Sequence, residues 1–132
     1  MLPLMQGIRE AVSCPVAALP VAYRTTREHP SFVSLEGEHL ELLPNGRPFP
    51  TALDPFTCDR YEVAQFARDA QALGVGYIGL CCGAAPHHVR SLAEALGRTP
   101  EASRYSPDLS KHAFLGDPQQ LGREHTIDAQ EV

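Results

Sequence analysis

The sequence predicts one small α/β unit built on parallel strands, and the order of its segments indicates this. Two compact apolar runs, 16–23 and 75–80, have the composition of buried strands. They alternate with three segments in which apolar residues recur at helical spacing, at about 2–12, 59–73 and 86–96. Strands that alternate with helices favour parallel pairing through crossover helices. A chain of 132 residues accommodates one domain of this kind.

The first helix begins almost at Met1 and is expected to end before Pro15. Its predicted apolar face consists of Leu4, Met5, Ile8, Ala11 and Val12. No polar capping residue precedes it. We therefore interpret it as a helix whose preceding strand lies ahead of Met1.

The second and third helices carry clearer signals at their ends. Asp59 with Glu62 three residues later predicts a capping box, and Gly74 predicts the stop. Pro86 suits the first turn of the third helix, and Gly97 suits its end. The predicted buried face of that last helix consists of Val89, Leu92, Ala93 and Leu96.

Two stretches show no sustained period. Residues 24–58 read as a long loop, in which 39–46 suits a small hairpin because Asn45-Gly46 favours a tight turn. Residues 98–132 read as an irregular C-terminal tail. We therefore divide the chain into a folded part, 1–97, and this tail.

Composition limits the possible functions. A net charge of −5 without a basic block argues against nucleic-acid binding and against an anionic membrane surface. No apolar run is long enough to span a bilayer, and the N-terminus does not read as a signal peptide. These features favour a cytoplasmic location, where four cysteines are expected to be metal ligands or thiols rather than disulfides.

The most informative stretch is Tyr-Ile-Gly-Leu-Cys-Cys-Gly, residues 77–83. It places Cys81 and Cys82 at the carboxyl end of a strand and just ahead of a helix, where α/β folds carry their chemistry. Thiolates are soft ligands that bind zinc. The residues alone leave two alternatives open, a buried thiol pair and a vicinal disulfide. A redox role is less favoured, because redox motifs usually separate the cysteines by two residues.

The other chemically active side chains have structural interpretations. We expect Cys14 to fill the core and Cys58 to be structural beside the cap at Asp59. His87 and His88 are expected in the first turn of the last helix, with one turned outward, rather than as metal ligands.

Three motifs together resemble the closing section of the zinc-dependent homocysteine S-methyltransferases. They are Asp-Arg-Tyr-Glu-Val-Ala-Gln-Phe-Ala-Arg at 59–68, Leu-Gly-Val-Gly-Tyr-Ile-Gly-Leu-Cys-Cys-Gly at 73–83, and Pro-His-His-Val-Arg at 86–90. Leu-Ser-Lys-His at 109–112 looks like the tail of the betaine-using branch. The resemblance runs from about residue 1 to 116 and corresponds to the last third or so of such an enzyme.

The resemblance implies a partial (β/α)8 TIM barrel, namely its last two strands and three helices plus a C-terminal tail. It implies that Cys81 and Cys82 are zinc ligands, with the third thiolate expected upstream of Met1. It also implies substrate contacts at Leu80, Gly83 and Tyr23, although the family has a small residue where Leu80 stands.

The implied reaction transfers a methyl group from a betaine-type donor to zinc-activated homocysteine and yields methionine. The implied partners are homocysteine, a donor such as betaine, and either a second copy or the rest of the barrel. With two thiolates in hand, the isolated chain is expected neither to hold zinc tightly nor to transfer methyl groups. The alternative is a non-enzymatic remnant or interaction domain that self-associates.

Overall fold

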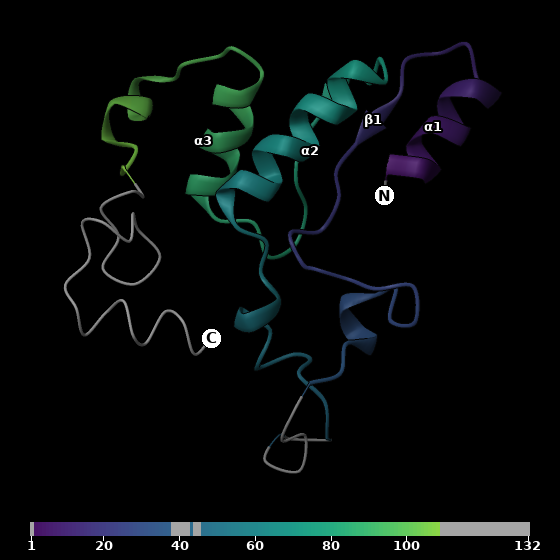
Figure 1. The fold of residues 1–132 in the computed structure, drawn as a ribbon, viewed down its shortest axis with the longest axis vertical. Coiled ribbons are helices and arrows are strands. Elements are labelled where there is room, and N and C mark those ends of the chain that lie inside the picture. Colours follow the sequence, from purple (N-terminus) through teal and green to yellow (C-terminus); the bar gives the residue numbers. More distant parts are fainter. Residues whose placement is uncertain (1, 38–42, 44–45, 109–132) are drawn as a thin grey trace, which may run out of the picture. The chain divides into compact units, whose positions relative to one another are not determined.

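The computed structural model of this chain describes residues 2–37, 43 and 46–108. Helices and strands follow each other in the predicted order: α1 (Leu2–Ala11), β1 (Ala17–Ala18), α2 (Arg60–Ala72), β2 (Tyr77–Ile78) and α3 (Pro86–Ala95) (Figure 1). The chain divides into two compact units, Met1–Glu101 and Ala102–Val132. In the second unit, the guanidinium of Arg104 lies 4.7 Å from the ring centre of Tyr105. The first unit contains both of these strands and the three α-helices.

The two strands pair in parallel, with Ala17 opposite Tyr77 and Ala18 opposite Ile78. Both are shorter than the predicted 16–23 and 75–80, although backbone hydrogen bonds continue beyond them. The amide of Cys81 donates to the carbonyl of Pro20 at 2.8 Å. Pro20 has no amide proton to return, so the regular ladder weakens at this position.

Within the described residues, the sheet is covered on one face only. Val16, Ala18 and Ala22 are buried, whereas Ala17 and Leu19 between them are exposed. This alternation is the period of two that a strand imposes on its side chains. Two apolar clusters lie between the sheet and the helices, and Ile78 packs against both; they are Met5, Ala18, Ala70 and Val75, and Val63, Ala67 and Leu92.

The predicted apolar face of α1 is only partly buried. Met5 is 3% exposed, but Leu4 is 64% exposed, and Ile8 and Val12 are also exposed. The predicted apolar stripe thus contributes one fully buried residue to the core. Met5 packs in the cluster with Ala18, Ala70 and Val75.

The capping signals of α2 are confirmed. The Oδ1 atom of Asp59 accepts from the amides of Tyr61 and Glu62, both at 2.8 Å, and Glu62 accepts from the Asp59 amide at 2.7 Å. Each carboxylate thus binds an amide that the helix leaves unpaired. Gly74 follows the helix end with a φ of 75°, which a glycine adopts without strain.

Helix α3 begins at Pro86 as predicted, but its buried face differs. Val89 is 54% exposed, which contradicts its predicted burial, while His88, Ser91 and Leu92 are buried. The reason is that α3 packs chiefly against α2 (Figure 1), which turns a more polar side of the helix inward. Leu92 was predicted correctly.

The described parts of 24–58 contain two short 3-10 turns, Phe32–Ser34 and Asp54–Phe56. Tyr23 forms an isolated antiparallel bridge with Thr57, which brings the two ends of this segment together. The predicted hairpin at 39–46 lies mostly outside the described residues. No helix in the described part of the chain is long and apolar enough to cross a membrane.

Candidate thiol site

Cys81 and Cys82 lie just beyond the end of β2, and both are exposed. Their Sγ atoms are 3.7 Å apart and do not form a disulfide. The two alternatives left open by the sequence, a buried pair and a vicinal disulfide, therefore do not describe this structure. The pair is available to a ligand from solvent.

The spacing of the two sulfurs fits a tetrahedral zinc site. Zinc–thiolate bonds of about 2.3 Å at the tetrahedral angle place neighbouring sulfurs about 3.8 Å apart. The observed 3.7 Å matches this value. Within the described residues, no group of three or more His, Cys, Asp or Glu side chains is placed to hold a metal. The pair by itself has the spacing of two neighbouring zinc ligands, and the described residues place no third ligand beside it.

The two thiols influence each other. The pKa of Cys82 is raised above its ordinary value, first by its hydrogen bond with Cys81 and then by the charge of the Cys81 thiolate. A second negative charge on the adjacent sulfur is unfavourable, so the pair resists full ionisation. A bound cation would remove this repulsion, because it offsets both charges at once.

Tyr23 packs directly on the glycine that follows the thiols. Gly83 has a φ of 81°, and a Cβ atom built on it would lie 2.5 Å from Cζ of the Tyr23 ring. The Tyr23 ring stacks on Phe32 at 5.5 Å, and Phe32 contacts the edge of Phe49 at 5.7 Å. Two of the predicted substrate contacts, Tyr23 and Gly83, are therefore in contact with each other beside the thiols.

Leu80, the third predicted substrate contact, is half-buried and packs against the cluster of Val63, Ala67 and Leu92. It thus points toward the helices. A Cβ atom built on the preceding Gly79 would instead meet Leu19 on the exposed face of the sheet. Substrate binding at all three residues remains a prediction.

His88 lies in the first turn of α3, as predicted, and makes specific contacts there. Its Nδ1 accepts from the amide of Ala85 at 3.0 Å, and its Nε2 lies 2.8 Å from the carbonyl of Cys58 and 3.1 Å from Nε2 of His87. His88 is 2% exposed, whereas His87 is exposed, as the prediction of one outward histidine required. Nothing in the sequence indicated that His88 reaches Cys58, because thirty positions separate them.

The remaining cysteines are placed unequally. Cys58 is half-buried, and burial raises the pKa of its thiol, which supports its structural interpretation. Cys14 is exposed, so its predicted place in the core was wrong. It follows α1 in the exposed turn before Pro15, outside the apolar clusters.

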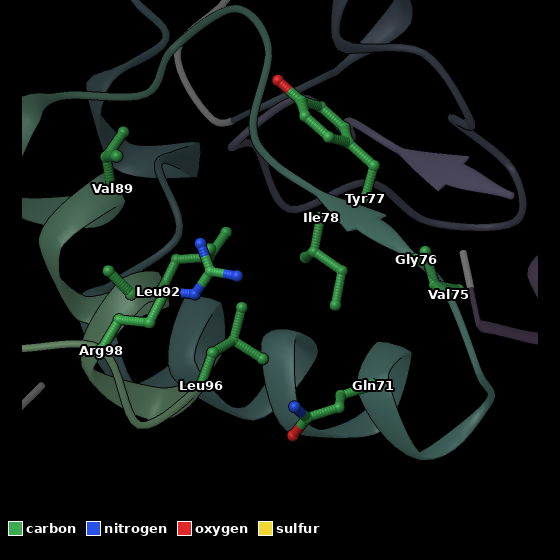
Figure 2. A pocket seen from close by; sticks show the side chains of 10 residues that line it. Gln71, Val75, Gly76, Tyr77, Ile78, Val89, Leu92, Leu96 and Arg98 are labelled. Carbon is green, nitrogen blue, oxygen red and sulfur yellow. The ribbon is translucent and has the colours of Figure 1, made fainter. Parts of the chain in front are cut away.

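A pocket of about 300 Å³ lies between β2 and α3. Figure 2 shows Ile78 pointing toward Leu92 and Leu96, while Tyr77 points away from these helix residues. The amide of Gly79 donates to the carbonyl of Ala18, so by alternation the polar backbone groups of Ile78 face the other edge of the strand. Among the described residues, β2 therefore has an open edge, and a hollow lined by apolar side chains together with Gln71 and Arg98 adjoins it.

No family model matches the chain. Among curated proteins, it is 43% identical over 68 residues to betaine–homocysteine S-methyltransferase 1 of Rattus norvegicus and 48% identical over 72 residues to that of Danio rerio. It is 41% identical over 68 residues to S-methylmethionine–homocysteine S-methyltransferase of Rattus norvegicus. Each match covers 52% of this chain.

The chain covers only 16% of the length of the first two relatives and 18% of the third. The family resemblance drawn from the sequence, to a C-terminal portion of such a protein, is confirmed over about half of the chain, which is less than the expected 1–116.

Proposed function

We propose, from this resemblance to a C-terminal portion of the homocysteine S-methyltransferases, that the chain contributes two zinc ligands to a methyl-transfer site. Cys81 and Cys82 are the ligands, and the reaction moves a methyl group from a betaine-type donor to homocysteine, which yields methionine. The two methyl donors in the names of the relatives, betaine and S-methylmethionine, both carry the methyl group on a cationic centre.

One observation carries this proposal: two exposed, unbridged thiols at the tip of a parallel strand stand 3.7 Å apart. That separation suits neighbouring ligands of a tetrahedral zinc ion. Zinc, when bound, lowers the pKa of a coordinated thiol and so turns homocysteine into a nucleophile near neutral pH. Tyr23 and Gly83 lie on the same rim and are the proposed substrate contacts, together with Leu80.

The sheet supports the idea that the remainder of a (β/α)8 barrel completes the site. Two strands do not close a barrel. The face of the sheet opposite the helices exposes Leu19 and Tyr77, at 49% and 64%, and β2 has an open edge. The remaining barrel portion would cover this face, pair with that edge and supply the third thiolate.

The isolated chain should bind a thiophilic metal weakly, and binding should need both thiols. We expect Cd²⁺ titration of the chain, followed through the thiolate-to-metal absorption band, to show weak uptake. Cys81→Ser and Cys82→Ser should each abolish it, and Cys14→Ser, at an exposed thiol outside the site, should not. Stoichiometric zinc retained after dialysis would overturn the expectation of weak binding. Unchanged Cd²⁺ uptake by both site variants would overturn the ligand assignment.

Methyl transfer is tested by complementation. The chain is co-expressed with the rat betaine–homocysteine S-methyltransferase 1 truncated before the matched segment. The expected result is methionine formation that depends on betaine and homocysteine, with activity lost in Cys81→Ser or Cys82→Ser and kept in Cys14→Ser. A zinc-loaded complex without turnover would refute the proposal.

The open sheet face also favours a second candidate, an interaction domain that self-associates without catalysis. Exposed apolar groups gathered on one face are typical of association surfaces. Sedimentation should then show a concentration-dependent dimer that Tyr77→Glu or Leu19→Lys dissociates, while Leu4→Lys on α1 leaves it intact. A monomer at all concentrations would exclude this candidate.

A further inference from the structure

We propose that His88 is the positioning residue of the thiol pair, holding the backbone of Cys82 in place through a closed ring of hydrogen bonds. This inference rests on the proposed function, in which the two sulfurs act together as metal ligands. His88 itself is not proposed as a ligand.

The protonation of His88 follows from its contacts. Nδ1 accepts from the Ala85 amide at 3.0 Å, so Nδ1 carries no proton. The proton of the neutral ring is therefore on Nε2, which donates to the carbonyl of Cys58 at 2.8 Å. Burial of the side chain to 2% exposure keeps water from competing for either contact. The imidazole of His88 thus links Ala85, which precedes α3, to Cys58, which precedes Asp59 at the start of α2.

The ring closes through Cys58 and Ala22. The amide of Cys58 donates to the carbonyl of Ala22, and the amide of Ala22 donates to the carbonyl of Cys82, both at 2.9 Å. From Cys82, the covalent chain leads through Gly83 and Ala84 back to Ala85. Every step of this circuit is either a hydrogen bond or the chain itself, and His88 provides the only side chain in it.

The ring acts on the thiols because it fixes the backbone from which they project. Both side chains are exposed, so the surrounding protein leaves their direction to the backbone. Cys81 is held separately, because its amide donates to the carbonyl of Pro20 at 2.8 Å and its carbonyl accepts from the amide of Ala84 at 3.3 Å. Cys82 depends on the ring, so loss of His88 should alter the placement of one sulfur relative to the other.

A plainer role is possible for the same residue. Ala85 is the N-cap residue of α3, and its methyl side chain cannot accept a hydrogen bond from the helix. His88, at the third helical position, instead accepts from the backbone amide of Ala85 and so contributes to capping the helix. If that were its whole role, only the contact with Ala85 would matter. The two roles are separable, because asparagine can replace Nδ1 and glutamine can replace Nε2.

The test uses the full chain and phenylarsine oxide, which binds two neighbouring thiols at once. Each sulfur forms a bond to arsenic, and the two thiol protons leave with the oxide oxygen as water, so no oxidation occurs. Affinity for this probe reports the mutual placement of the sulfurs. The variants are His88→Asn, which keeps the contact with Ala85, and His88→Gln, which keeps the contact with Cys58. His29→Gln is the control, on a histidine that contacts no member of the ring. Thermal unfolding by circular dichroism is recorded for each.

We expect both His88 variants to bind the arsenical roughly 10- to 100-fold more weakly than the wild type, the range seen when the support of a ligand is removed. His29→Gln should bind normally. Normal binding by His88→Asn would show that His88 is only a helix cap, and normal binding by both variants would overturn the proposal altogether. Absence of binding in the wild type would instead overturn the placement of the thiols on which the proposed function stands.

A measurement on the wild type keeps the proposal testable if the variants unfold. Bridging the thiols with the arsenical should slow amide exchange at Ala22, Cys58 and Ala85 together, since these donors share the ring. Exchange at Val12, whose amide donates within the end of α1, should not change. Slowing at Ala22 without slowing at Cys58 and Ala85 would refute the ring.

Discussion

The ring of Tyr23 occupies the space into which a side chain at Gly83 would project. A Cβ atom on Gly83 would lie 2.5 Å from Cζ and 2.9 Å from the hydroxyl oxygen of Tyr23. The residue after the thiol pair is therefore constrained twice, by its φ of 81° and by an aromatic ring. This contact ties the end of the β1 segment to the loop that carries the thiols.

We expect Gly83→Ala to destabilise the chain by about 2–4 kcal/mol, the sum of left-handed backbone strain and steric overlap. Gly97→Ala is the matched control, because Gly97 has a similar φ of 74°, but no described residue lies within 4 Å of the Cβ atom that alanine would add. It should lose only about 1 kcal/mol. Urea unfolding compares the two. An equal decrease in the free energy of unfolding for the two variants would mean that the Tyr23 ring moves aside without cost.

Replacing Cys81 with Ala should make Cys82 more reactive. The raised pKa of Cys82 comes from its hydrogen bond with Cys81 and from the Cys81 charge, and the substitution removes both. The pKa of Cys82 should fall, so more thiolate is present near neutral pH and alkylation by iodoacetamide is faster. Mass spectrometry of the labelled peptides separates the sites, with Cys14 as the internal reference. A slower or unchanged rate at Cys82 would contradict the coupling.

Stability should decrease as the pH falls below about 6.5, the ordinary value for histidine. Partial desolvation, followed by the neighbouring His88 ring and the positive charges of Arg90 and Arg60, lowers the pKa of His87 in the folded chain. The unfolded chain then binds a proton at a higher pH than the folded chain does, which favours unfolding on acidification. His87→Gln should flatten this slope in urea midpoints measured between about pH 7.5 and 5, a window that spans the ordinary histidine value. If the urea midpoint of His87→Gln depended on pH as strongly as that of the wild type, another titratable group would be responsible for the pH dependence.

The cap of α2 should contribute measurably to stability. Asp59→Ala removes the acceptor for the amides of Tyr61 and Glu62 and should cost about 1 kcal/mol. Gln71→Ala, at an exposed position of the same helix, should change the free energy of unfolding by less than about 0.5 kcal/mol. Chemical unfolding of the two variants checks this. An equal change in the free energy of unfolding would show that the Asp59 cap does not stabilise α2.

Acid should also weaken the contact between Arg24 and Glu62. The guanidinium of Arg24 binds both carboxylate oxygens of Glu62, at 2.9 and 2.6 Å, and this hydrogen bonding lowers the pKa of Glu62. The contribution is therefore present above the ordinary carboxylate pKa of about 4.3 and is lost as the pH falls through the lower folded value. Arg24→Gln should reduce the acid-dependent part of stability. If the stability of Arg24→Gln fell with acid pH as steeply as that of the wild type, the pair of Arg24 and Glu62 would contribute nothing to this pH dependence.

Local signals in the sequence were sufficient to predict the order of the elements and the ends of α2 and α3. Asp59 with Glu62 and the stops at Gly74 and Gly97 depend on residues a few positions apart, and all are observed. The cysteine pair at a strand tip was likewise visible as a motif. Strand lengths were less accurate, because the pattern of apolar residues does not show where Pro20 interrupts the ladder.

The sequence by itself determined that helices and strands alternate and that two thiols follow a strand, since periodicity, capping and composition act over a few residues. The tertiary structure decided which side of α3 is buried, exposing Val89 and enclosing His88, because that depends on packing against α2. It also brought His88 within 2.8 Å of the Cys58 carbonyl. Contacts across thirty residues arise only when the folded chain places separate segments side by side, and no local pattern encodes their distance.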